Sequence, residues 1–166
     1  MKKLAVFSIT MLGFYTASFA QVSASASTSA TIITPIAISK SIDMNFGNVA
    51  VSPTVPGTVV LPTSGARTQT GGVTLPVTTG TVAAAKFTVT GLAASTYSMT
   101  LPGTITLTSG SNTMTVGTFT STPTPTGVLT GGTQDILVGG TLNVAAAQAA
   151  GSYSNASDLV VTTNYN

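Results

Sequence analysis

The stretch that decides the fold is residues 96–109, which read TYSMTLPGTITLTS. Its large apolar residues recur at every second position, with threonine or serine between them: Tyr97, Met99, Leu101, Ile105 and Leu107. A period of two places such side chains on one face of a β-strand, whereas a helix repeats about every 3.6 residues. The Pro-Gly pair at 102–103 is typical of a turn. The stretch therefore predicts two strands joined by a turn.

The same alternation continues outward over most of the chain. Apolar residues share one face at 73–77, 85–89, 114–116, 136–138 and 142–144. Clusters of glycine, proline, asparagine and serine separate these runs by about eight to twelve residues, which is typical of a sandwich or barrel. We therefore predict an all-β protein built as an antiparallel sandwich of roughly seven to nine strands. The helix-tolerant alanines at 145–150 are expected to form a loop.

The first 20 residues have the layout of a secretory signal peptide. Lysines at positions 2 and 3 precede an apolar run over 4–14, and small residues at 18 and 20 suit signal peptidase. The run is shorter than the roughly 20 residues of a membrane-spanning helix. We expect cleavage before Gln21, although Ala24 and Ala26 would also tolerate it. The mature protein is then secreted, in the periplasm in transit and afterwards at the cell surface or extracellular.

Charge is nearly absent from the remaining chain. Three cations face three aspartates, so the net charge after cleavage is 3 − 3 = 0: Lys40, Arg67 and Lys86 against Asp43, Asp135 and Asp158. A neutral chain has no basic surface for nucleic acid or for an anionic membrane. We therefore expect no nucleic-acid partner and no membrane span in the mature chain.

The residues that most enzymes use are also missing. The chain has no histidine, cysteine or glutamate. A Ser-His-Asp or Cys-His arrangement is impossible, and ordinary zinc sites lack their ligands. The three aspartates flank strands near turns and match no catalytic signature. We predict a protein that is not an enzyme, with no catalytic, cofactor-binding or metal-binding residues and no cofactor.

The segment after the signal alternates as well. Its even positions carry apolar or small residues, with serine or threonine between them: Val22, Ala24, Ala26, Thr28 and Ala30. In one interpretation, residues 30–39 form an ordinary first strand of a domain over 30–166, and residues 21–29 are a disordered tail. In the other, the early half is a donor strand that adds to the sheet of another subunit.

Three stretches together indicate a family. They are ATIITPIAISKSIDMNFG at 30–47, KFTVTG at 86–91 followed by 97–102, and VGGTL at 138–142 followed by Gly-Ser-Tyr at 151–153 and a closing strand over 159–166. Their order resembles a family of small secreted bacterial proteins known only as a domain of unknown function. More loosely, it resembles spore coat protein U and the subunits of archaic chaperone–usher pili.

The wider resemblance implies an immunoglobulin-like sandwich that lacks one strand. A periplasmic chaperone would fill the gap first, and the N-terminal strand of the next subunit would fill it later. One face of the closing strand is implied to pair with the chaperone: Leu159, Val161, Thr163 and Tyr165. Many such pilins carry a disulfide, which this cysteine-free chain cannot form.

Two functions follow as hypotheses. The first is a pilin-like or coat-like structural subunit that self-associates at the cell surface by β-strand addition. The second is a monomeric secreted sandwich that binds a surface polysaccharide or a protein partner through loops such as Ser121–Thr130 or Ser64–Gly72.

Overall fold

The computed structural model describes residues 20–166. Residues 33–166 form a compact unit, whereas residues 20–32 form no helix or strand and expose their side chains. The predicted signal peptide lies outside the described residues, apart from Ala20. Within residues 20–166, no helix is long and apolar enough to cross a membrane.

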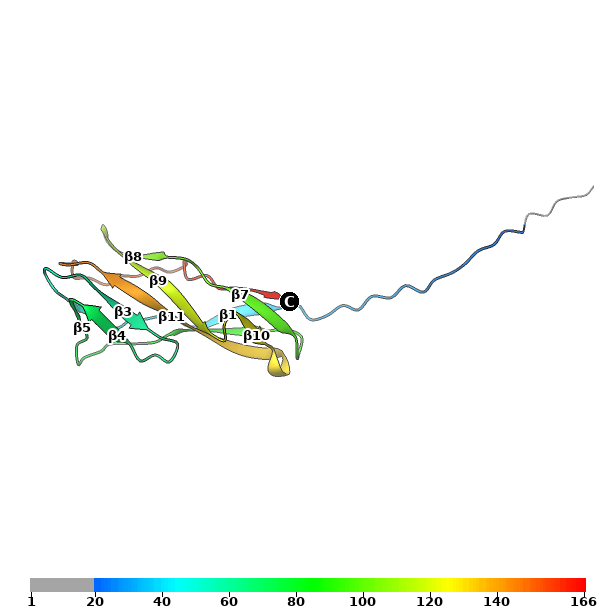
Figure 1. The fold of residues 1–166 in the computed structure, drawn as a ribbon, viewed down its shortest axis with the longest axis horizontal. Helices are drawn as coiled ribbons and strands as arrows, with labels where there is room; N and C mark the ends of the chain where they lie inside the picture. Colours follow the sequence, from blue (N-terminus) through cyan, green and yellow to red (C-terminus); the bar gives the residue numbers. More distant parts are fainter. Residues whose placement is uncertain (1–19) are drawn as a thin grey trace, which may run out of the picture. The chain divides into compact units, whose positions relative to one another are not determined.

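The described part of the chain contains twelve strands and one short 3-10 turn (Figure 1). They are β1 (Ala37–Ile42), β2 (Ala50–Val51), β3 (Gly57–Leu61), β4 (Thr68–Gly71), β5 (Val73–Thr74), β6 (Ala85–Thr90), β7 (Thr96–Thr100), β8 (Ile105–Ser109), β9 (Asn112–Thr122), β10 (Thr126–Val128), η1 (Thr130–Gly132), β11 (Thr133–Val144) and β12 (Thr162–Tyr165).

Strand β11 organises the largest sheet. Along one of its edges it pairs first with β6 and then with β3, and along the other edge it pairs with β9. Strands β1, β4 and β8 extend the sheet from β6, β3 and β9, so that seven antiparallel strands curl into a half-barrel. A second sheet has the order β10-β7-β12, and β2 pairs with β5 in a third.

A glycine pair lets β11 change partners in the middle of the sheet. Gly139 and Gly140 are both buried where β6 ends and β3 begins as the neighbour of β11. A Cβ on Gly139 would overlap the carbonyl oxygen of Leu61, and one on Gly140 would lie 3.0 Å from the ring of Phe119. Glycine is therefore required here because backbone and ring approach too closely for a side chain.

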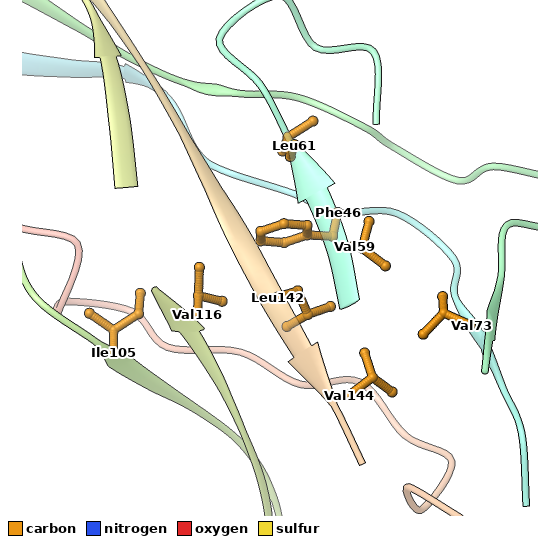
Figure 2. Packing of buried hydrophobic residues seen from close by; sticks show 8 residues of the cluster. All are labelled: Phe46, Val59, Leu61, Val73, Ile105, Val116, Leu142 and Val144. Carbon is orange, nitrogen blue, oxygen red and sulfur yellow. The ribbon is translucent and has the colours of Figure 1, made fainter. Parts of the chain in front are cut away.

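The core consists of two apolar clusters. Figure 2 shows the first, which lies between β3, the second half of β11, β8 and β9: Phe46, Val59, Leu61, Val73, Ile105, Val116, Leu142 and Val144. The second packs between β6, the first half of β11 and the β10-β7-β12 sheet: Ala85, Phe87, Val89, Tyr97, Leu129, Ile136, Val138 and Val161. Met44, Phe119 and Leu159 contact both clusters.

The all-β prediction is confirmed, and the two strands predicted from 96–109 are β7 and β8. They do not form a hairpin, because β7 lies in the three-stranded sheet and β8 in the seven-stranded one. The described residues form twelve strands instead of seven to nine, since several strands are two to four residues long. The stretch at 145–150 is a loop, as predicted.

The predicted boundaries of the first strand were wrong. Strand β1 covers Ala37–Ile42 and not 30–39, because its partner β6 ends at Thr90, which lies opposite Ala37. Thr34 lies before the strand, and its carbonyl oxygen accepts a hydrogen bond from the hydroxyl of Tyr165 at 2.9 Å. The alternation over 22–38 therefore continues beyond the residues that have a pairing partner in the same chain.

Candidate strand-binding groove

A groove of about 1130 Å³ lies between two segments that are not paired with each other. One wall is residues 40–51, which begin in β1 and continue past it, and the other is residues 148–159, which precede β12. Apolar side chains of the first core cluster and its neighbours line the floor: Phe46, Ile105, Leu107, Met114, Val116, Leu142 and Val144. Within residues 20–166, no backbone hydrogen bond connects residues 40–51 with residues 148–159.

The Asn-Phe-Gly motif shapes the first wall. The side-chain oxygen of Asn45 accepts the amide of Gly47 at 2.8 Å, while the backbone of Asn45 pairs with Ala83. Gly47 has a φ of 69°, a left-handed conformation that favours glycine. The intervening Phe46 is thereby directed into the floor. Arg67 braces the turn by donating to the backbone oxygens of Phe46 and Asn48, the latter at 2.8 Å.

The Gly-Ser-Tyr motif shapes the second wall. The hydroxyl of Tyr153 donates to the carbonyl oxygen of Ala149 and accepts from the side-chain amide of Gln148, both at 2.8 Å. The backbone of Ser154 exchanges two hydrogen bonds of 3.0 Å with Thr108 on β8. Consecutive residues of an extended chain direct their polar groups to opposite edges. The backbone of Tyr153 is therefore turned away from β8.

Charge contributes little to the groove. The charged residues in its lining are Lys40 and Asp43, which form an exposed ion pair with 2.6 Å between Nζ and Oδ1. Asparagine, glutamine, serine and backbone groups supply the other polar contacts of the lining. The groove is therefore suited to a neutral, partly apolar ligand that can form main-chain hydrogen bonds.

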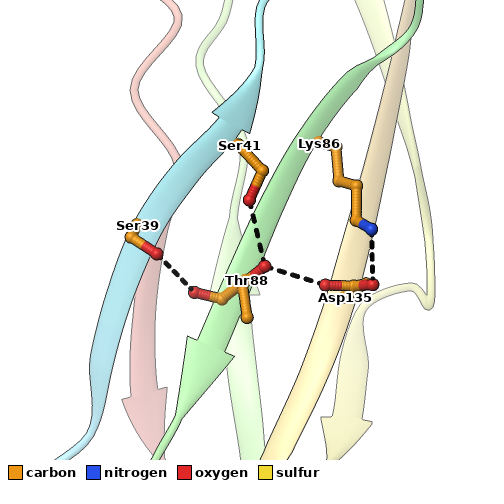
Figure 3. A network of polar contacts seen from close by, with 5 residues as sticks. All are labelled: Ser39, Ser41, Lys86, Thr88 and Asp135. Atoms are coloured by element: carbon orange, nitrogen blue, oxygen red, sulfur yellow. Dashed lines mark hydrogen bonds and ion pairs between the residues drawn. The ribbon is translucent and has the colours of Figure 1, made fainter.

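A polar network lies on the outer face of the β1-β6-β11 strands (Figure 3). Lys86 approaches Asp135 at 2.7 Å, and Thr88 donates to the same carboxylate at 2.8 Å. Ser41 contacts the Thr88 hydroxyl at 3.1 Å. The hydrogen bonds from Lys86 and then Thr88 lower the pKa of Asp135. Lys86 lies opposite the buried Ala85 and Phe87 side chains, as its alternation predicts, and the network links three strands.

The predicted donor residues belong to the exposed segment that precedes the compact unit. Val22, Ala24, Ala26, Thr28 and Ala30 lie outside every strand, and their side chains are exposed. The structure describes one copy of the chain, so the donor role stays a prediction.

The closing strand alternates as predicted. Val161 is buried, and Leu159, Thr163 and Tyr165 are half-buried, whereas the intervening residues are exposed. Leu159 and Val161 precede β12, which begins at Thr162. Strand β12 pairs with β7 along one edge only. Pairing of its other edge with a chaperone stays a prediction.

The groove itself could not be identified from sequence. Its floor residues carry the same alternating pattern as the rest of the core, so nothing in the pattern separates a lined groove from a closed interior. The available signal was the pair of non-repetitive motifs, at 45–47 and 151–153, which form the two walls. Within residues 20–166, no three side chains among histidine, cysteine, aspartate and glutamate cluster as metal ligands would.

Fold and groove together define a small antiparallel β-domain with an open groove, apolar at its floor, between two segments that are not paired with each other. The chain belongs to the family described as a domain of unknown function (DUF4402), whose profile matches residues 36–165. This match confirms the resemblance to a family known only as such a domain. No curated protein and no solved structure matches the chain.

Proposed function

We propose that this protein is a secreted structural subunit that assembles at the cell surface by β-strand addition. The groove of one copy accepts the extended segment over residues 21–30 of another copy. The observation that carries the proposal is that the two walls, residues 40–51 and 148–159, are not paired with each other above an apolar floor. An added strand gains affinity from main-chain hydrogen bonds and specificity from the pockets for alternate side chains.

In this proposal the compact unit is an immunoglobulin-like sandwich that lacks one strand. Strands β1 and β12 lie close together although they belong to different sheets, and each is paired along one edge. A strand inserted beside them would extend both sheets and cover the gap between them. The irregular residues 148–161 would then have a partner to order them.

The inward positions of the donor, which include Ala24, Ala26 and Ala30, are small. The floor of the groove carries large residues such as Phe46, Leu107 and Met114. A small inward residue would displace these floor side chains less than a large one would.

A periplasmic chaperone is the second partner in this proposal. An open groove exposes apolar surface, and free strand edges are prone to unspecific pairing. A chaperone strand placed along β12 would cover both until the next subunit arrives. Leu159, Val161, Thr163 and Tyr165 turn their side chains inward there and leave the outer backbone edge available.

The test compares a charge on the inward face of the donor segment with the same charge on its outward face, both in the full chain. Ala30→Asp places a charge on the inward face, and Ser29→Asp places the same charge one residue away on the outward face. Both positions remain after cleavage at any of the three expected sites. Protein sheared from cells is run on a denaturing gel with and without boiling.

We expect wild type and Ser29→Asp to give a ladder of multimers that boiling collapses, and Ala30→Asp to give monomer. A ladder of equal strength from both variants would contradict donation by this segment. Monomer from the wild type, with a monomeric elution volume, would favour the secreted binding domain instead.

A further inference from the structure

Most of the exposed large apolar residues of the compact unit gather at its two ends. One group is Ile33, Leu92 and Val128, and the other is Val51, Val55 and Val77. Exposed apolar residues that are scattered singly need no explanation, but groups of them mark interaction surfaces. We call the first group the exit end, because the donor segment leaves the compact unit at Ile33, and the second group the far end.

Hydrogen bonds hold the exit end together. The hydroxyl of Tyr165 accepts the amide of Leu92 at 2.6 Å and donates to the carbonyl oxygen of Thr34 at 2.9 Å, next to Ile33. Val128 belongs to the same end, since its neighbour Leu129 donates to Ser95 at 2.9 Å, in the turn that starts at Leu92.

The far end is built from the β2 and β5 region. Val51 pairs with Val73, and the amide of Val55 donates to the hydroxyl of Ser52 at 3.2 Å. Val77 lies beside the same wall, because the Asn48 side chain donates to the adjacent Thr78 carbonyl oxygen at 3.0 Å. Strand β11 separates the ends. Its 12 residues run from Thr133, near the exit end, to Val144, a span of roughly 40 Å.

The donor segment leaves almost no spacer between two joined copies. Its alternation extends to Ile32, and the compact unit begins at the next residue. If residues 21–30 occupy the groove of a neighbour, only Thr31 and Ile32 separate the donor strand from the compact unit, so the exit end of the donor must lie close to one end of that neighbour. Which end it meets depends on the direction in which the donor runs.

The two directions have different consequences for the apolar ends. A donor antiparallel to β1 would bring two exit ends together, which gives a closed dimer by reciprocal exchange and leaves both far ends exposed to water. A donor antiparallel to β12 would bring the exit end of one copy against the far end of the next. Only this second arrangement covers both apolar groups and lets the chain of copies continue.

We infer that the exit end of one copy binds the far end of the next, so that the assembly is an open head-to-tail chain. This inference rests on the proposed strand addition. It adds a second interface between the same two copies, made of Ile33, Leu92 and Val128 on one side and Val51, Val55 and Val77 on the other.

The chain has no cysteine, so engineered thiols report these contacts directly. Full-length Leu92→Cys, Val77→Cys and the double variant are assembled and treated with a short bis-maleimide. A second double variant, Val128→Cys with Val55→Cys, guards against a poorly aligned pair of thiols. Thr88→Cys with Val77→Cys is the control, because Thr88 lies on the outer face of the large sheet.

We expect a ladder that survives boiling from an end-to-end double variant, at least tenfold stronger than from either single variant or from the control. A boiling-resistant dimer from Leu92→Cys alone would overturn the inference in favour of the closed dimer. An unboiled ladder without any cross-linking in either double variant would also overturn it, while strand addition would stand. Absence of the unboiled ladder in wild type would refute strand addition, and the inference with it.

Discussion

The hydrogen bond between Tyr97 and Gln134 offers a sharp test of how the β10-β7-β12 sheet is attached to β11. Tyr97 is fully buried, and its hydroxyl donates to the side-chain oxygen of Gln134 at 2.8 Å. The same oxygen accepts the amide of Val128 at 2.9 Å. One acceptor therefore connects β7 and β10 of the small sheet to β11.

Replacing Tyr97 and replacing Gln134 should lower the free energy of unfolding by different amounts. Tyr97→Phe removes the donor but leaves the Gln134 oxygen bonded to Val128, so we expect a loss of about 1 kcal/mol in the free energy of unfolding. Gln134→Met leaves both the Tyr97 hydroxyl and the Val128 amide without their acceptor, and we expect about 2–4 kcal/mol. The corresponding falls in Tm are about 3–5 °C for the first variant and clearly more for the second.

Urea unfolding of both variants and of the double variant measures these losses. In the Tyr97→Phe background, the cost of Gln134→Met should shrink by about 1 kcal/mol, since one of its two orphaned groups is already gone. Equal losses from the two single variants, or strict additivity, would refute the interpretation of Gln134 as a shared acceptor.

Tyr97 also makes the stability of the fold depend on pH in the alkaline range. Burial raises the pKa of Tyr97 above its ordinary value of 10.0. A raised folded-state pKa means that the stabilisation is fully present below about pH 10 and is lost as the pH rises through the folded value. Wild type should therefore lose stability above pH 10 more steeply than Tyr97→Phe. Parallel alkaline profiles would contradict this.

Three further outcomes follow from particular contacts. Hydrogen bonds from Lys86 and Thr88 lower the pKa of Asp135. Its contribution to the stability of the fold is therefore present above about pH 3.8 and is lost as the pH falls through the lower folded-state pKa. The urea midpoint of Asp135→Asn should vary less between pH 5 and pH 2 than that of wild type. Gly139→Ala should lower the free energy of unfolding by about 2 kcal/mol or more, because its Cβ would lie 2.9 Å from the Pro62 carbonyl carbon. Gly103→Ala is the control, since its Cβ would meet no atom within 4 Å, and its free energy of unfolding should stay within about 0.5 kcal/mol of wild type. Thermal unfolding measures both. Tyr165→Phe should speed hydrogen exchange of the Leu92 amide about tenfold relative to wild type, since that amide loses its acceptor.

The sequence predicts which faces are buried better than it predicts which strands pair. The alternation of Tyr97 with Ser98, or of Val161 with Thr162, depends on local geometry alone, and burial follows it closely. Pairing depends on contacts distant in sequence. Strands β7 and β8 are neighbours along the chain and still enter different sheets, because β8 pairs with β9 and β7 pairs with β10 and β12.

The groove shows the same limit. Floor residues such as Met114 and Val116 follow the alternation of any core strand, and only the absence of a facing strand makes them a lining. An absent strand leaves no trace in the pattern of the strands that are present. What the sequence does carry is Asn45-Phe46-Gly47 and Gly151-Ser152-Tyr153, which break the alternation where the two walls must turn.

The near absence of charge has a structural counterpart that bears on assembly. On the outer face of the large sheet, hydroxyl and amide groups satisfy each other across strands, as Thr58 does with Thr70 at 2.7 Å and Asn143 with Thr115 at 3.2 Å. Neutral cross-strand contacts of this kind therefore supplement the Lys86–Asp135 ion pair on this face.

The strand edges are different. Among the edge strands, β4, β10 and β12 contain no charged residue and β1 carries one, Lys40, although charged side chains are a common means of blocking unwanted pairing at an edge. A free monomer with such edges and an open groove would be prone to aggregate. A subunit whose groove is filled in the assembly, and covered during transport, needs no such protection there. If the protein is such a subunit, as we propose, the scarcity of charge and the open groove are two consequences of one function.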